Sequence, residues 1–393
     1  MDRHVDHLLI GGGIAAATCA QALRQEGATG SVLLVGRELD PPYHRPPITK
    51  GYLGGAETKD DTLIEVPDDV EVLTRTSVMA LDTAARTATL ATKEIVEYGS
   101  ALLATGAMVR RLQIDGMQLD GIHYLRALGN ADALRRDVED AEHVVCVGGS
   151  YIGCETAATL TTLGKRCTVV LLEEEPMERG FGLQVGRWVR SVLAGHGVQV
   201  VGGAEVERFE GDGDRVQRVV LAGGQVLAAD VVVAGVGVTP DVMLARKAGL
   251  QIGDRGGVRA DAQLRAHGAD GLYVAGDMAE YDSTVHGAVV RIEHEEVAAA
   301  HGRTVAANML GADAEHTEVP YFWSDLADWA SVEFVGAAQA WDEEVVDGDM
   351  PSGAFTVWYV RDGRTVGMLS AGGHGDVDGG KALIVAGAAP PAG

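Results

Sequence analysis

Two glycine-rich turns constrain this chain more than any other feature. The first is Gly11–Ala16 (GGGIAA), which follows the apolar run Val5–Ile10. The second is Gly148–Gly153 (GGSYIG), which follows His143–Val147. In a strand–turn–helix unit the glycines let the backbone approach a pyrophosphate, and the helix N-terminus supplies positive potential. One such turn also serves ordinary packing, but two predict two nucleotides held together, and electron transfer between them is the simplest reason.

Composition limits the kind of protein. The chain has 393 residues, 46% of them hydrophobic, and a mean hydropathy of +0.06, which fits a globular protein of two or three domains. No apolar run reaches the length of a membrane span and the first residues are too polar for a signal peptide, so we expect a cytoplasmic location. The net charge of −25 argues against nucleic acid or an anionic membrane as a partner.

The cysteines point to a cofactor rather than to thiol chemistry. Cys19, Cys146, Cys154 and Cys167 form no CxxC pair and no zinc-type spacing, and three of them fall inside the predicted nucleotide-binding elements. We expect them to be small buried hydrophobic residues, and we expect no metal site. Redox chemistry would then have to run through a bound cofactor.

Alternating strand and helix signals predict an α/β chain with two Rossmann-like dinucleotide-binding domains. We expect the first domain to be discontinuous, over 1–112 and 238–318, and the second, over 113–237, to interrupt it. From 319 onward the strand signals predict a separate C-terminal α+β domain over 319–393. The proline-rich segment Pro41–Pro47 is expected to be a stiff, extended loop.

An acidic residue about 20 positions after the glycine turn is expected to bind the ribose hydroxyls. In the second unit this residue is Glu173, which predicts NAD rather than NADP because a carboxylate repels a 2′-phosphate; a solvated acidic run is the alternative. Ser150 replaces the second glycine there and can donate its hydroxyl to a phosphate. In the first unit the same position is Gly36, so Arg37 and Glu38 are the nearest candidates, with plain surface charge as the alternative for Arg37.

Longer segments resemble one known family. They read PYHRPPITK at 42–50, LLATG at 102–106, YVAGD at 273–277, RIEH at 291–294 and VPYFWSD at 319–325. In this order they resemble the FAD-dependent NAD(P)H:ferredoxin reductases of the glutathione-reductase superfamily, such as putidaredoxin and rubredoxin reductases, with similarity to apoptosis-inducing factor. The resemblance covers nearly the whole chain. It implies a fold of the glutathione reductase type, with FAD in the first domain and NAD in the second.

The resemblance assigns roles to individual residues. Lys50 would lie beside the reactive nitrogen of the flavin and pair with Glu155, because a cation there stabilises the reduced flavin. Asp277 would bind the ribityl chain, and Arg45 and Arg126 would contact the FAD phosphates or the adenine region. Ordinary alternatives are a surface lysine with a helix-face glutamate, a turn aspartate, and an arginine that pairs with a local carboxylate. The residues expected to bind the cofactors are Gly11, Gly13, Ile14, Ala15, Ala16, Arg37, Glu38, Arg45, Lys50, Val78, Ala104, Thr105, Gly106, Arg126, Gly276, Asp277, Glu295 and Trp323 for FAD, and Gly148, Ser150, Tyr151, Ile152, Gly153, Glu173 and Gly237 for NAD.

Two positions depart from the family pattern. Many relatives carry tryptophan after the histidine of the RIEH-like segment, where this chain has Glu295 at the start of a predicted helix. An acid suits a helix N-terminus, and a carboxylate near the flavin would also lower its reduction potential. The segment Ser324–Leu326 replaces the SDQ of oxygenase-type reductases and is closer to apoptosis-inducing factor. Trp323 would lie near the flavin edge and the ferredoxin interface, or would simply pack the C-terminal domain.

These features predict an FAD-dependent oxidoreductase that takes hydride from NADH and passes electrons to a ferredoxin or another small acceptor, as a monomer or a homodimer. The competing hypothesis is an NADH-sensing flavoprotein resembling apoptosis-inducing factor, with slow turnover and a stable charge-transfer complex. Ferredoxins are acidic, so a chain at −25 would need a local basic patch to dock one, and the adjacent arginine pairs Arg110–Arg111 and Arg135–Arg136 are the candidates. Thiol-dependent relatives are disfavoured, because the segment 41–50 holds no cysteine.

Overall fold

The computed structural model describes residues 3–337 and 340–391, and its first glycine turn leaves the central strand of a parallel sheet. In this first sheet β1 lies between β2 and β6, β3 lies beyond β2, and β18 pairs with the C-terminal half of β6. The β4–β5 hairpin adds to the N-terminal half of β6. These strands are β1 (Arg3–Ile10), β2 (Val32–Val35), β3 (Glu71–Leu73), β4 (Val78–Asp82), β5 (Thr87–Leu90), β6 (Ile95–Leu103) and β18 (Leu272–Val274).

The second glycine turn leaves the central strand of another parallel sheet, in which the strand order is β11-β10-β9-β15-β8. In both sheets the strand before the turn is central, and the next strand of the βαβ unit pairs with it on one side. The two units that the sequence predicts therefore share the same arrangement of strands around their glycine turns. The strands are β8 (Ile122–His123), β9 (His143–Val147), β10 (Arg166–Val170), β11 (Gln199–Val201) and β15 (Val231–Ala234), and the helices of this region are α4 (Leu128–Val138) and α5 (Tyr151–Thr162).

Two helices pack closely beside the first sheet because their contact surfaces are small. α1 (Ile14–Gln25) is rich in buried alanine, and α8 (Glu295–Met309) crosses it at Gly302. A Cβ atom at Gly302 would lie 2.5 Å from the carbonyl oxygen of Ala15, so only glycine permits this approach. α8 is thereby fixed against the first turn of α1.

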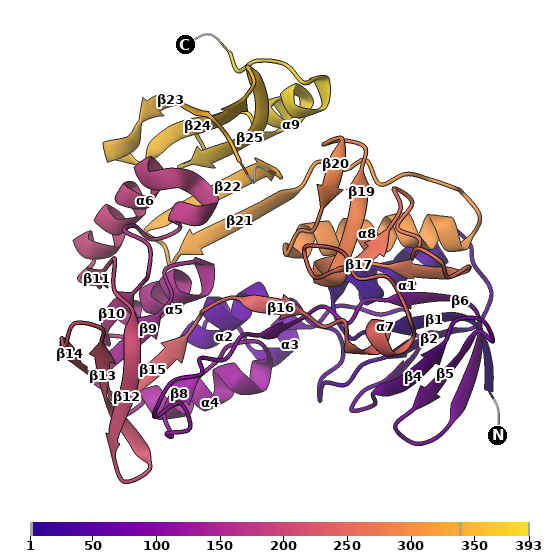
Figure 1. Cartoon of the computed structure of the whole chain (residues 1–393), viewed down its shortest axis with the longest axis horizontal. Coiled ribbons are helices and arrows are strands. Elements are labelled where there is room, and N and C mark those ends of the chain that lie inside the picture. The colour runs from indigo at the N-terminus through magenta and orange to yellow at the C-terminus, as the bar shows by residue number, and fades with distance from the viewer. Residues whose placement is uncertain (1–2, 338–339, 392–393) are drawn as a thin grey trace.

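Short antiparallel strands connect and cover the two units. β7 (Ala107–Val109) and β16 (Val238–Pro240) pair where the chain passes between the two parallel sheets, as Figure 1 shows. One three-stranded sheet packs on the second unit, and another lies beside α8 in Figure 1. The remaining elements of this region are β12 (Val206–Asp212), β13 (Arg215–Leu221), β14 (Val226–Ala228), β17 (Val258–Ala260), β19 (Ala279–Ser283), β20 (Ala288–Val290), α7 (Met243–Lys247) and η2 (Gly276–Met278).

The C-terminal region forms an antiparallel sheet in the order β21-β22-β25-β24-β23. It packs against the second unit through α6, where the rings of Phe181 and Phe322 stack with centroids 6.0 Å apart. The α/β fold class and the α+β C-terminal part are as predicted. The elements are β21 (Tyr321–Leu326), β22 (Ala330–Gly336), β23 (Glu343–Asp349), β24 (Ala354–Arg361), β25 (Arg364–Ala371), α6 (Glu178–Gly195), α9 (Val377–Ala386) and η3 (Met350–Ser352).

The loop that the prolines predicted over Pro41–Pro47 ends at Arg45, because its last two residues are helical. Pro46 and Pro47 begin a 3₁₀ helix, η1 (Pro46–Thr49), which runs into α2 (Gly51–Gly54) and is followed by α3 (Lys59–Thr62). Proline suits the first turn of a helix because its fixed φ is helical. The N–H groups of that turn have no hydrogen-bond partner within the helix, so the N–H that proline lacks costs nothing there. Within the described ranges, every helix is too short or too polar to cross a membrane.

Candidate functional site

A cavity of about 610 Å³ lies between the two glycine turns and brings most of the predicted site residues together. Its volume falls in the range of about 300–1,000 Å³ that is typical of ligand sites. The predicted residues that line it are Gly11, Gly13, Ile14, Ala15, Arg37, Glu38, Arg45, Lys50, Val78, Ala104, Thr105, Gly106, Arg126, Ser150, Tyr151, Ile152, Glu155, Gly237, Gly276, Asp277, Glu295 and Trp323. Ala16, Gly148, Gly153 and Glu173 lie outside the cavity lining.

The two turns use their first glycine in the same way. Gly11 has a φ of +140°, and a Cβ there would lie 2.0 Å from the carbonyl oxygen of Ala104. Gly148 has a φ of +112°, and a Cβ there would lie 2.2 Å from the carbonyl oxygen of Gly235. Each turn thus passes directly over the end of the neighbouring strand, which opens room above it for a ligand.

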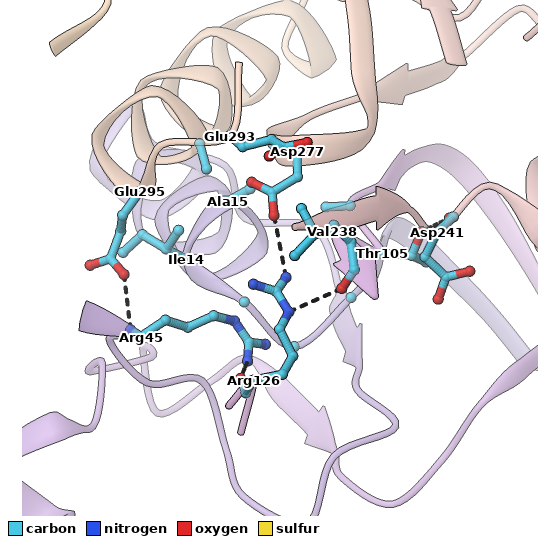
Figure 2. Close-up of a pocket in the computed structure, with 18 of the residues that line it drawn as sticks. Ile14, Ala15, Arg45, Thr105, Arg126, Val238, Asp241, Asp277, Glu293 and Glu295 are labelled. Atoms are coloured by element: carbon cyan, nitrogen blue, oxygen red, sulfur yellow. Dashed lines mark hydrogen bonds and ion pairs between the residues drawn. The ribbon is translucent and has the colours of Figure 1, made fainter. Parts of the chain in front are cut away.

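The first turns of α1 and α5 offer free backbone donors to the cavity. Gly13 and Ser150, their N-cap residues, make no side-chain capping hydrogen bond, and neither helix has an acidic residue in its first turn. Figure 2 shows Ile14 and Ala15, the first residues of α1, facing the pocket. An uncapped helix N-terminus without acidic neighbours is an anion site, so these residues fit the pyrophosphate of a dinucleotide.

A partly buried hydrogen-bond network holds Arg45 in the cavity. Its guanidinium donates to a carboxylate oxygen of Glu38 at 2.6 Å, to the Tyr43 hydroxyl at 2.9 Å and to the carbonyl oxygen of Arg126 at 2.6 Å. Burial raises the pKa of Glu38, but the Arg45 charge and hydrogen bonds outweigh it, so the net pKa of Glu38 is lowered. Glu38 therefore stays ionised and orients Arg45, a use that the spacing argument did not anticipate.

Arg126 pairs with a carboxylate, which was one of its two predicted roles, and also lines the cavity. It lines the cavity, and its side chain donates to the Ala107 carbonyl at 3.0 Å and to Asp277 at 3.2 Å. Figure 2 shows Arg126 extended between Arg45 and Asp277. Burial, and then the charge of Arg45, lower its pKa, which is the mark of two cations held side by side. The repulsion between the two guanidinium groups would be relieved by a bound anionic ligand.

Lys50 and Glu155, far apart in sequence, form a buried ion pair. Lys50 Nζ lies 2.7 Å from Glu155 Oε1, and the two side chains are 16% and 7% exposed. The hydroxyls of Thr49 and Ser324 donate to the two carboxylate oxygens at 2.7 and 2.6 Å. These hydroxyls were missed as site residues, although both lie inside the family-like segments. Nζ also lies 4.8 Å from the ring centroid of Trp323, which is 37% exposed.

Arg37 lies at the rim of the cavity and forms an ion pair with a residue far away in the sequence. Its Nη1 lies 2.7 Å from a carboxylate oxygen of Asp241, while its side chain is 52% exposed. The Thr105 hydroxyl donates to the Asp241 carbonyl at 2.6 Å, so Asp241 ties the rim together. No sequence signal marked Asp241, because its partners are distant in the chain.

Glu295, the departure from the family pattern, fastens α8 to the segment before η1. Its two carboxylate oxygens accept from the Arg45 backbone N–H at 2.9 Å and contact His44 Nδ1 at 2.6 Å. The neighbouring His294 stacks on Phe322 at 3.8 Å, and burial lowers its pKa to about 4. His294 is therefore uncharged at neutral pH and packs the cavity wall.

The contact between His44 and Glu295 should make stability depend on pH. The hydrogen bond that the His44 ring donates to the Glu295 carboxylate raises the pKa of His44 above its ordinary value, against the opposing effect of burial. A raised histidine pKa stabilises the folded chain most at low pH, and this contribution is lost as pH rises through the folded-state value. We expect the difference in free energy of unfolding between wild type and His44→Gln to shrink between about pH 6 and pH 8.

Urea denaturation across this pH range measures that difference. In a Glu295→Gln background the cost of His44→Gln should depend much less on pH, because only the weaker effects of Glu296, Glu57 and burial on the pKa of His44 remain. A difference that stays constant in the wild-type background, or grows with pH, would contradict the pairing.

The remaining sequence expectations concern groups away from the cavity. All four cysteines are free and buried, as expected, and none lines the cavity. Glu173 follows β10 and pairs with Arg179. Of the arginine pairs, Arg111 lies 5.1 Å from the ring of Tyr124 and Arg135 lies 5.8 Å from the ring of Tyr52, so both are engaged by aromatic rings.

Comparison with known proteins gives the family. Residues 5–302 match the pyridine nucleotide-disulphide oxidoreductase model and residues 321–393 match the reductase C-terminal model. The chain is 34% identical to the 5,5'-dehydrodivanillate O-demethylase ferredoxin reductase subunit of Sphingobium sp. (strain NBRC 103272 / SYK-6), over 98% of this chain and 94% of that protein. It is 31% identical to the rubredoxin-NAD(+) reductase of Pseudomonas putida, over 86% and 88%.

Among solved structures, the covalent putidaredoxin reductase–putidaredoxin complex matches with a TM-score of 0.92 and 28% identity, over 98% of this chain and 94% of that one. The structural match therefore extends over almost the whole length of both chains. The chain belongs to the pyridine nucleotide-disulphide oxidoreductase family and carries its reductase C-terminal domain.

Proposed function

We propose that this protein is an FAD-dependent reductase that takes electrons from NADH and passes them to a ferredoxin-type protein. The family implies FAD and a pyridine nucleotide, and the relatives above are named as ferredoxin and rubredoxin reductases. The observation that supports it most is the cavity, which is lined by residues of both glycine turns and by the Lys50–Glu155 pair. The second hypothesis, an NADH sensor with slow turnover, is not favoured.

When bound, the flavin supplies the chemistry that converts a two-electron donor into electrons for a one-electron acceptor. The chain supplies orientation and charge. Arg45, Arg126 and the N-terminus of α1 fit the FAD pyrophosphate, and Asp277 fits the hydroxyls of the ribityl chain. Lys50 holds a positive charge inside the cavity, and Glu155 with its two hydroxyl partners keeps the ammonium in place.

Trp323 is the group best placed to link the cavity to a protein acceptor. It lines the cavity, contacts Lys50 and is also exposed, so it forms part of the cavity wall and of the outer surface at once. Electrons leaving the cavity here would cross one aromatic side chain. The arginine pairs that the sequence offered as a steering patch are exposed, and the tyrosine rings beside Arg111 and Arg135 leave their charge in place.

The experiment that tests this function is an acceptor assay on the purified flavoprotein. Under anaerobic conditions NADH is mixed with the protein in a stopped-flow instrument, and reduction of added [2Fe–2S] ferredoxins and of rubredoxin is followed in steady state. Rapid flavin reduction with ferredoxin-dependent reduction of cytochrome c is expected. Slow reduction to an air-stable long-wavelength complex, with no acceptor turned over, would support the sensor instead.

We further propose that NADH is preferred over NADPH, on the basis of Glu173. Replacement by alanine removes the carboxylate that would bind the ribose hydroxyls and frees the cation of Arg179, which is 80% exposed. The ratio of kcat/KM for NADPH to that for NADH is expected to rise by at least about tenfold, roughly the value of one charged hydrogen bond. Initial rates with both coenzymes measure it. Arg179→Ala is the matched control and should leave the preference for NADH in place; an unchanged ratio in Glu173→Ala would contradict the assignment.

We keep three further predictions as part of this proposal. The FAD domain would comprise 1–112 and 238–318, the NAD domain 113–237 and the C-terminal domain 319–393. Support for the discontinuous domain comes from β18, which pairs with β6 of the first sheet. A cytoplasmic location, and a monomeric or homodimeric state, stay predictions.

A further inference from the structure

A buried histidine lies directly beneath the corner that carries Asp277. The backbone N–H of Gly276 donates to His301 Nδ1 at 3.2 Å, and His301 is fully buried in α8. Gly276 has a φ of +72°, so the chain turns sharply here before Asp277 enters the cavity. On the other side of the corner, Arg291 donates to the Asp277 carbonyl at 3.0 Å. The backbone on both sides of the corner is therefore held by side chains.

The protonation of His301 is determined by its neighbours. Burial, and then the nearby His316, lower its pKa well below the ordinary value, so the imidazole is neutral. Because Nδ1 accepts the Gly276 N–H, the ring proton must be on Nε2. Nε2 is buried without a nitrogen or oxygen partner among the described residues. The rings of Tyr281 and His316 lie edge to face with His301, with centroids 4.8 and 4.6 Å away.

The surrounding packing fixes the position of this acceptor. Gly302, the next residue of α8, contacts α1 so closely that a Cβ would lie 2.5 Å from the Ala15 carbonyl. α8 therefore cannot slide along α1, and the His301 ring is enclosed by Tyr281 and His316. A neutral imidazole in a fixed position can accept one hydrogen bond through the lone pair of Nδ1, here from the backbone N–H of Gly276.

We propose that His301 is a positioning residue, whose Nδ1 holds the Gly276 N–H so that the Asp277 carboxylate is presented to the ribityl chain of FAD. This inference rests on the proposed function, because it concerns the same flavin site. His301 would not touch the cofactor; it would act through the geometry of the corner between Gly276 and Asp277. Loss of the acceptor would leave a buried N–H unpaired and let the corner relax.

The test compares two substitutions that differ in the acceptor. In His301→Asn, the side-chain carbonyl can take the place of Nδ1; His301→Leu is similar in size to asparagine but has no acceptor. We expect the Kd for FAD, measured by fluorescence titration of the apoprotein, to rise by about tenfold or more in the leucine variant and to stay within about threefold of wild type in the asparagine variant. Thermal denaturation of each apoprotein reports stability separately.

A matched control separates positioning from general loss of packing. His316→Leu removes the other buried imidazole of the cluster but leaves the Gly276 acceptor, so it should lower stability without weakening FAD binding. Equal FAD affinity in all variants, an asparagine variant as weak as leucine, or a His316→Leu variant as weak as His301→Leu would overturn the inference. If the leucine variant does not fold, His301→Gln replaces it. The side-chain carbonyl of glutamine lies one bond further from the backbone, so this variant should bind FAD less tightly than His301→Asn.

The proposed function can fail independently of this inference. If the wild-type protein binds no FAD, the reductase assignment fails; if it binds FAD and the variants do not differ, only the role of His301 fails.

Discussion

Replacing Gly11 with alanine is expected to yield protein that binds FAD at least about tenfold more weakly than wild type and is isolated largely without flavin. The new Cβ would lie 2.0 Å from the Ala104 carbonyl oxygen, and the φ of +140° is a conformation that essentially only glycine adopts, at a cost of about 1–3 kcal/mol for other residues. The turn must move, and with it the N-terminus of α1 that faces the cavity. Flavin content per chain and FAD titration measure the loss.

A matched pair of variants shows whether the effect belongs to the first turn. Gly153→Ala creates the same kind of collision in the second turn, 1.9 Å from the Gly148 carbonyl oxygen, and should keep FAD but lose rapid reduction by NADH. Gly27→Ala carries comparable backbone strain at φ +87° with nothing within 4 Å, so it should affect neither cofactor. Normal flavin content in Gly11→Ala, or loss of flavin in Gly27→Ala, would contradict the account.

The second large effect is expected at the buried ion pair. In Lys50→Met the carboxylate of Glu155 stays buried without its cation, and breaking a buried pair in this way typically costs about 3–5 kcal/mol. The hydroxyls of Thr49 and Ser324 still donate to this carboxylate, so we expect the free energy of unfolding to fall by about 3 kcal/mol, the lower end of that range. If Lys50 stabilises the reduced flavin as proposed, the rate of flavin reduction by NADH should fall on the order of 100-fold when its charge is removed.

The double variant Lys50→Met, Glu155→Leu separates stability from chemistry. Removing both charges leaves no unpaired buried ion, so most of the lost free energy of unfolding should return, while the reduction rate should stay low. Urea denaturation and single-turnover reduction measure the two quantities. Recovery of the rate in the double variant would show that Lys50 acts only by holding the site together, contrary to the proposed role.

The sequence predicts the fold well wherever an apolar run is fully buried between clear turns. β9 coincides with the run His143–Val147 that precedes the second glycine turn, and α8 begins at Glu295 as expected. Such segments carry their own signal, because burial on both faces requires a continuous run of β-branched residues. The loop predicted for Pro41–Pro47 was wrong at Pro46 and Pro47, because proline fits the first turn of a short helix as well as an extended loop.

The sequence predicts less of the site, for a physical reason. Motifs identify positions such as Gly11 and Gly148, because a positive φ and the close approach of a neighbouring strand require glycine there. They do not identify pairs formed by folding, such as Arg37 with Asp241, or the hydroxyls that hold Glu155. The expectation that Glu38 binds a ribose stays a prediction, while its contacts with Arg45 and Tyr43 carried no signal in the sequence.

The central claim is that the flavin and the nicotinamide meet in the cavity between the two glycine turns. The most direct measurement is an anaerobic titration of the FAD-reconstituted protein with NADH, followed by visible absorption, in wild type and in Gly153→Ala. We predict that NADH bleaches the flavin band of the wild type stoichiometrically and leaves the Gly153→Ala flavin oxidised on the same timescale. Protein that takes up no flavin, or a bound flavin that neither NADH nor NADPH reduces, would contradict it.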